Sequence, residues 1–167
     1  IPGWMHAQHP PGCVQISPRG NDDNACVMMT ADGGTTSKTW MVSAPFKAPA
    51  TGRLAVSLQT KCEPVGEGGT PISIRVGIEG RVQGEPLRQS VILQPVADGN
   101  WQSEPMWLEV ADLGGEQIED LRLTVDLLTP GRVWIDDIRL YGFFLSQDEQ
   151  SGLQSRTFLA VQRIRQG

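Results

Sequence analysis

Four separate stretches of this sequence alternate strictly between apolar and mostly polar residues, and this pattern limits the possible folds more than any other feature. Every second residue is Leu, Ile, Val or Met in residues 54–59, 72–79, 106–111 and 121–128. Side chains of a β-strand point alternately to its two faces, so each stretch predicts a strand with one face toward a core. Less regular strands are predicted at residues 13–17, 25–30, 39–46, 87–94 and 133–141.

The segments between these strands carry the residues that form turns. Gly, Pro, Asn and Asp gather at residues 18–23, 32–34, 49–52, 98–100 and 129–131. A parallel sheet needs helical crossovers between its strands, and no helical pattern separates these. The sequence therefore predicts an all-β fold, a two-sheet antiparallel β-sandwich of the jelly-roll kind, as a single domain over residues 1–145.

The end of the sequence has a different pattern. Ser146 followed by Glu149 matches a helix capping box, and Leu153, Val161 and Ile164 recur at helical spacing. We predict one C-terminal α-helix near residues 146–165, within a tail of residues 146–167. Its apolar residues must cover something. Packing on its own sandwich is our first expectation, and docking on a partner is the second.

Composition and charge exclude several classes of function. The net charge of −5 without a basic patch argues against binding of nucleic acid or anionic membranes, and no apolar run is long enough to span a bilayer. Neither a Gly-x-Ser-x-Gly nucleophile motif nor a phosphate-binding loop is present. His6 and His9 have no carboxylate or thiol at metal-ligand spacing. We expect a domain that binds or connects and is not an enzyme.

The three cysteines leave two interpretations open. Cys13 and Cys26 flank a polar turn and would face each other in a hairpin, as in a disulfide, whereas Cys62 would then remain free. Alternatively, all three are buried thiols that act as small apolar residues.

Several short motifs occur in an order typical of a known family. Residues 131–141 read Gly-Arg-Val-Trp-Ile-Asp-Asp-Ile-Arg-Leu-Tyr, preceded by Gly3-Trp4, by residues 43–46 and 51–57, and by Asn100-Trp101-Gln102. Over residues 3–141 the sequence resembles jelly-roll carbohydrate-binding modules of the galactose-binding-like fold. The Phe-Glu strand that usually precedes the Gly-Trp pair is missing, and the helical tail is foreign to the usual module.

The resemblance implies a partner and a location. Such modules bind a polysaccharide or oligosaccharide and are attached to neighbouring domains of a larger secreted protein. We therefore expect this domain to be extracellular, periplasmic or on the cell surface. The alternative is a structural or protein-interaction β-sandwich that binds no sugar, since one fold supports many functions.

The resemblance also implies one structural calcium ion. In the family, the second Asp of the Asp-Asp strand often helps to hold it, which points to Asp137 beside Asp136. Asp137 shares the phase of Val133 and Ile135, so we expect it to point inward, where a carboxylate needs a cation or several donors. Backbone N–H groups or an Arg are the alternative partners of this carboxylate.

A tryptophan that binds sugar must lie out of phase with the core, because its ring has to be accessible. Trp107 meets this condition, since it alternates with Met106 and Leu108. Arg75 and Glu109 lie on polar strand faces and are the supporting candidates for hydrogen bonds to a sugar. The other tryptophans are predicted to pack: Trp40 in the core, in phase with Val42, and Trp4 and Trp101 at the ends of the sandwich.

Overall fold

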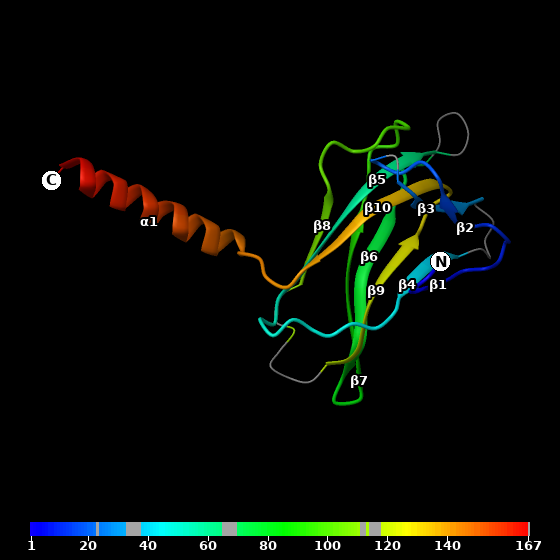
Figure 1. Cartoon of the computed structure of the whole chain (residues 1–167), viewed down its shortest axis with the longest axis horizontal. Coiled ribbons are helices and arrows are strands. Elements are labelled where there is room, and N and C mark those ends of the chain that lie inside the picture. Colours follow the sequence, from blue (N-terminus) through cyan, green and yellow to red (C-terminus); the bar gives the residue numbers. More distant parts are fainter. Residues whose placement is uncertain (23, 33–37, 65–69, 111–112, 114–117, 167) are drawn as a thin grey trace.

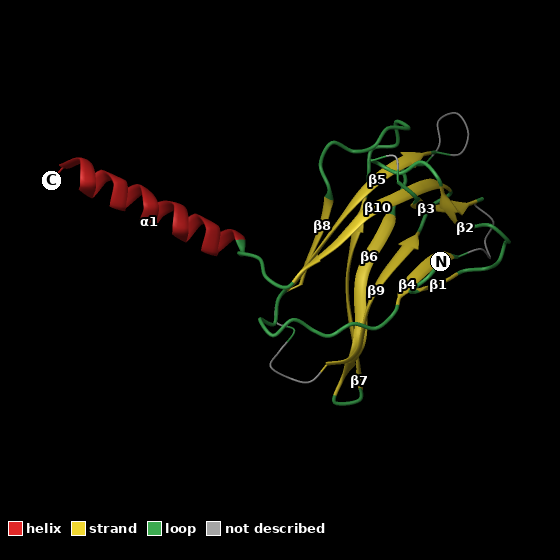
Figure 2. Cartoon of the chain, viewed as in Figure 1, coloured by secondary structure: helices red, strands yellow, loops and turns green. Residues whose placement is uncertain are grey.

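The computed structural model describes residues 1–22, 24–32, 38–64, 70–110, 113 and 118–166. It consists of two antiparallel sheets that pack face to face, and a single helix that leaves the sandwich (Figures 1 and 2). The all-β sandwich with a C-terminal helix predicted from the alternation is confirmed.

Each sheet has five strands in the described part of the chain. Sheet A has the order β1 (Trp4–His6), β4 (Thr39–Ser43), β9 (Ile118–Leu127), β6 (Ile74–Val82) and β7 (Glu85–Leu93). Sheet B has the order β2 (Val14–Ser17), β3 (Cys26–Ala31), β10 (Gly131–Tyr141), β5 (Leu54–Glu63) and β8 (Met106–Val110). Every neighbouring pair is antiparallel.

The core lies between the two sheets and is made by the apolar half of each alternating stretch. Leu121, Leu123 and Val125 of β9 point inward from the middle of sheet A, and Val133 and Ile135 of β10 do so from the middle of sheet B. Burying each large apolar side chain contributes about 1.5–3 kcal/mol, so these stretches are the main source of stability.

The structure adds a strand that the sequence pattern did not predict. Strand β1 has only three residues, and Trp4 to His6 pair with Ser43 to Met41 of β4. So short a strand has no periodicity to detect. We predicted that Trp4 packs at an end of the sandwich. In the structure it lies in a strand and is half-buried against the core.

Helix α1 (Gln147–Gln166) extends away from the sandwich (Figure 1). Its large apolar residues are exposed, Ile164 by 80%. The structure thus does not place the helix on its own sandwich, which was our first expectation, and docking on a partner stays a prediction. The helix is not apolar enough to cross a lipid bilayer.

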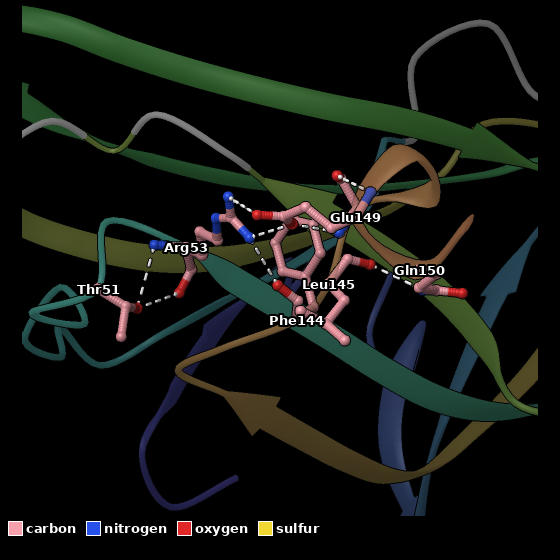
Figure 3. A network of polar contacts seen from close by, with 7 residues as sticks. Thr51, Arg53, Phe144, Leu145, Glu149 and Gln150 are labelled. Carbon is pink, nitrogen blue, oxygen red and sulfur yellow. Dashed lines mark hydrogen bonds and ion pairs between the residues drawn. The ribbon is translucent and has the colours of Figure 1, made fainter. Parts of the chain in front are cut away.

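Polar contacts fix only the first turn of α1 to the sandwich (Figure 3). The Arg53 guanidinium donates to both carboxylate oxygens of Glu149, at 2.6 and 2.9 Å, and to the Phe144 carbonyl at 3.0 Å. Glu149 also accepts the backbone N–H of Ser146 at 2.8 Å, and the Ser146 hydroxyl accepts the N–H of Glu149, so the predicted capping box is present. This contact sets where the helix starts.

The helix base should therefore respond to acid in a defined range. The hydrogen bonds from Arg53, and then the one from the Ser146 N–H, hold the pKa of Glu149 at about 2, below its ordinary 4.5. A lowered folded-state pKa stabilises the contact fully above the ordinary value and loses that effect as pH falls toward 2. We expect amide-exchange protection at residues 149–150 to persist at pH 4 and to disappear near pH 2.

The matched control is Arg53→Gln, which should return the pKa of Glu149 toward 4.5 and move the loss of protection to higher pH. Protection that is lost at the same pH in both proteins would contradict the assignment of Arg53.

Candidate functional site

The outer face of sheet A carries a row of polar and aromatic side chains across three strands. In the strand register, Trp40 of β4 lies opposite Asp126 of β9, and Asp126 lies opposite Arg75 of β6. The Arg75 Nε donates to Asp126 Oδ2 at 2.8 Å. All three side chains lie on the side of the sheet away from the core, since their chain neighbours Met41, Val125 and Val76 are buried.

The next row on this face has a glycine at its centre. Gly77 lies opposite Thr124 on one side and Ser90 on the other. A Cβ atom on Gly77 would come within 2.7 Å of the Ser90 Cβ and of the Gln89 carbonyl oxygen, so a side chain does not fit without a shift of β7. The space beside Gly77 is therefore filled by Ser90 and the β7 backbone, and the glycine lets β6 and β7 lie close together.

A groove surrounds Gly77 and continues along the sheet. Its first part, about 110 Å³, is lined by side chains of four strands, namely Trp40, Val42, Arg75, Glu79, Arg88, Ser90, Thr124 and Asp126. Its second part, about 290 Å³, shares Glu79 and Arg88 with the first and extends to Arg81, Asp120 and Arg122. The two parts therefore adjoin each other at the Glu79–Arg88 pair, on the outer face of β6, β7 and β9.

The groove offers hydrogen-bond donors and acceptors side by side. Besides Arg75 and Asp126, Arg88 Nη2 pairs with Glu79 Oε2 at 3.3 Å. Exposed ion pairs of this kind add little stability, but each orients its two side chains and keeps further donor and acceptor atoms toward solvent. Such a surface suits a ligand that carries many hydroxyl groups.

The position of Trp40 corrects a prediction. We expected Trp40 in the core because Val42 shares its phase. Thr39 and Met41 are the buried residues of β4, whereas Trp40 is half-buried: it packs against core residues and also lines the groove. Val42 is an apolar residue on the outer face, so the phase derived from it was wrong. The paired carboxylate and guanidinium on the neighbouring strands are visible only in the register.

The predicted site around Trp107 is divided between the two sheets. Trp107 and Glu109 lie on the outer face of sheet B, on the edge strand β8, whereas Arg75 lies on sheet A. The out-of-phase orientation of Trp107 is observed, since its side chain is 46% exposed. The structure brings Trp107 and Glu109 together but does not bring Arg75 to them.

A second aromatic residue lies beside Trp107. The ring centroids of Trp107 and Tyr141 are 5.5 Å apart, with the planes tilted by 34°. Together with Glu109, Phe143 and Leu145 they line a shallow hollow of about 300 Å³ next to the base of α1. On this surface too, an accessible aromatic ring lies beside polar groups.

Asp136 and Asp137 lie at a β-bulge, where the pairing of β10 with β5 shifts between Asp136 and Arg139. The Asp136 carboxylate accepts the backbone N–H groups of Asn21 and Asp137, both at 2.8 Å. Asp137 has a φ of 48° and pairs with Arg139 at 3.4 Å. Its side chain is 32% exposed, so the predicted inward orientation is not found, because the bulge interrupts the alternation.

The calcium site predicted at these residues stays a prediction. Among the described residues, no group of three His, Cys, Asp or Glu side chains lies close enough to hold a metal ion. Asp137 pairs with Arg139, and an Arg was one of our alternative partners for this carboxylate. Both Asp136 oxygens accept backbone N–H groups. Asp22, Asp23 and Asp32 are further candidate calcium ligands in place of the missing first-strand carboxylate, and Asp23 lies outside the described residues.

The three cysteines are buried free thiols. Cys13 Sγ donates to the Ala7 carbonyl at 3.5 Å and Cys26 Sγ to the Arg19 carbonyl at 3.4 Å, so the two do not face each other in a bridge. Burial raises the pKa of Cys62 to about 12, which makes this thiol unreactive near neutral pH.

No family model and no curated protein matches this sequence. Solved structures do match its fold. The family 16 carbohydrate-binding module 2 aligns with a TM-score of 0.53 and 13% identity, over 81% of this chain and 89% of that one. The non-crystalline-cellulose-specific module CBM28 gives 0.56 and 9%, over 83% and 86%. The xylan-binding CBM22-1 domain of Paenibacillus barcinonensis Xyn10C gives 0.55 and 15%, over 83% and 84%.

This chain has the jelly-roll fold of carbohydrate-binding modules. The resemblance of the short motifs to this fold is thereby confirmed. Sequence identities of 9–15% show a shared fold only. The surface of this chain is therefore the basis for any inference about its ligand.

Asp136 and Asp137 should differ in their effect on stability. Asp136→Asn leaves one of two half-buried backbone N–H groups without its acceptor, and we expect a loss of about 1–3 kcal/mol of unfolding free energy. Asp137→Asn, the matched control, removes only a pair with the exposed Arg139 and should cost less than about 1 kcal/mol. Urea unfolding followed by Trp fluorescence measures both. A larger loss in Asp137→Asn would contradict the hydrogen-bond assignment.

Proposed function

We propose that this chain is a non-catalytic carbohydrate-binding domain that binds a polysaccharide or oligosaccharide in the groove on the outer face of sheet A. The observation that carries the proposal is the half-buried ring of Trp40, which lines the groove together with the Arg75–Asp126 ion pair. A sugar ring has apolar C–H faces and a rim of hydroxyl groups. It therefore binds best where an aromatic surface adjoins fixed donors and acceptors, as it does between Trp40, Arg75 and Asp126.

The length of the groove favours a chain of sugars over a single ring. The lining residues of β6 run from Arg75 to Arg81, which is about 20 Å of extended strand. The groove is open along this direction, so an oligosaccharide enters it without a free chain end. The neighbours in fold include proteins named as xylan-binding and as specific for non-crystalline cellulose, and these two glycans belong in the first panel of ligands.

In this proposal the domain belongs to a larger secreted protein and holds a neighbouring domain close to the glycan, outside the cell, in the periplasm or on the cell surface. Helix α1 then connects or docks to that neighbour. Its exposed apolar side chains, with Phe158 and Ile164 the most exposed, support a role in contact with another domain.

Trp107 with Glu109 is a second candidate for the sugar platform. The specific observation in its favour is the pair of rings, Trp107 and Tyr141, which are 46% and 38% exposed beside a polar rim. The same surface adjoins the base of α1, so it suits a structural interaction domain equally well. The two candidates lie on opposite sheets, and one experiment separates them.

We expect Trp40→Ala to weaken glycan binding at least tenfold, since a central aromatic residue usually contributes more than about 1.4 kcal/mol to binding. Trp40→Phe, which keeps a ring, should retain most of the affinity. Isothermal titration against xylan, soluble cellulose derivatives and other plant, algal and bacterial polysaccharides measures this loss, with thermal unfolding as a check of the fold.

Trp107→Ala is the matched control on the other sheet and should bind as the original chain does. If Trp107→Ala loses binding and Trp40→Ala does not, the site is on sheet B. If the original chain binds no member of the panel, the proposed function is wrong. The alternative, a structural or protein-interaction domain that binds no sugar, then replaces it.

A structural calcium ion near Asp136 and Asp137 stays a separate proposal, supported by the resemblance of the Asp-Asp strand. A ligand that binds only the folded state raises its stability. If calcium binds, the melting temperature should fall by several degrees on chelation and recover with added calcium, but not with magnesium. Unchanged melting under all three conditions would refute the proposal.

A further inference from the structure

The second part of the groove is unusually rich in arginine for an acidic chain. Arg81, Arg88 and Arg122 line this hollow of about 290 Å³, whereas the whole chain has a net charge of −5. Two carboxylates, Glu79 and Asp120, line the same hollow. The local balance is therefore three guanidinium groups to two carboxylates.

Glu79 stands between two of these arginines and pairs with one. In the register, Glu79 of β6 lies opposite Arg88 of β7 on one side and Arg122 of β9 on the other. Its carboxylate lies 3.3 Å from Arg88. Within the residues that the structure describes, no carboxylate comes within ion-pair distance of Arg122.

Arg122 also differs from its neighbours in burial, because it is half-buried on a central strand whereas Arg81 and Arg88 are exposed. A guanidinium that has lost part of its water without gaining an anion is bound more favourably when an anion arrives. Its planar fork of donors matches the two oxygens of a carboxylate.

The strand register determines how far the Arg122 guanidinium lies from Trp40. Trp40 belongs to the row of Asp126 and Arg75, and Arg122 belongs to the row of Glu79. Four residues of strand, about 13 Å, separate the two rows. A charged group at Arg122 and a ring on Trp40 therefore belong to different sugar units of one chain.

We infer that the glycan bound in this groove is acidic, and that a uronic acid carboxylate on it pairs with Arg122, with Arg81 and Arg88 beside it. This inference rests on the proposed function and names the chemical class of its ligand. Neutral sugar units stack near Trp40, and the carboxylate adds the charge-assisted hydrogen bonds at the other end of the groove.

The test compares glycans that differ only in their charge. Oligogalacturonate is matched with its methyl ester, and glucuronoxylan with its carboxyl-reduced form, in titrations at low and high salt. We expect the acidic member of the better-binding pair to bind about tenfold to a hundredfold more tightly at low salt, the range for a hydrogen bond to a charged group. High salt should reduce this preference.

Two variants assign the preference to this hollow. Arg122→Gln should abolish the preference, so that the acidic and neutral forms bind this variant with equal affinity. Arg88→Gln should also reduce it, because Glu79 is then free to pair with Arg122. Arg132→Gln on sheet B is the control and should change nothing.

Equal affinity for the acidic and neutral forms would overturn the inference, and so would an equal loss of the preference in Arg132→Gln. Neither result touches the proposed function, which stands if the neutral forms still bind and Trp40→Ala abolishes that binding. Failure of all glycans to bind would instead refute the proposed function itself.

Discussion

The packing of the two inner sheet faces against each other is the interaction on which the rest of this molecule depends. Strands β9 and β10 lie in the middle of the two sheets, and their apolar residues meet in the core. Side chains point alternately to the two faces of a strand. Each residue that is buried in the core therefore places its chain neighbours on the outer face of the sheet. The burial of Met41 thus turns Trp40 outward, and the burial of Val125 turns Asp126 outward beside it.

The two outer faces that result have different chemistry. Sheet A presents two pairs of guanidinium and carboxylate groups along a groove on its outer face. The outer face of sheet B carries Trp134 between Lys61 and Arg132, and Trp107 beside Tyr141 near the start of α1. One sandwich therefore offers a polar groove on one side and an aromatic surface on the other.

A few polar contacts determine where helix α1 begins, but they do not determine which surface its apolar side chains pack against. Its first turn is held by Arg53 and by the capping box of Ser146 and Glu149. Beyond this turn, Leu153, Phe158 and Ile164 are exposed in the structure. A helix of this length gains most of its stability in proteins from tertiary packing. Its apolar side chains are therefore available to another chain or domain.

The sequence alone determined the class of the fold, the approximate strands and the position of the helix, because alternation and capping are local signals. It also identified Trp107 as exposed, since Met106, Leu108 and Val110 are alternate apolar residues that define the phase of β8. It failed where the local signal was false or absent: Val42 gave β4 the wrong phase, the bulge after Asp136 broke the alternation, and β1 was too short to detect.

Only the tertiary structure decided which polar residues meet. Arg75 and Asp126 are 51 positions apart in the sequence, and Glu79 and Arg122 are also far apart along the chain. The register of β6 with β9 nevertheless places the two residues of each pair side by side. Arg75 and Trp107 lie on different sheets, so they do not form one site. A strand's own residues encode which face each side chain occupies, but the neighbours across a sheet are chosen by the packing of the whole core.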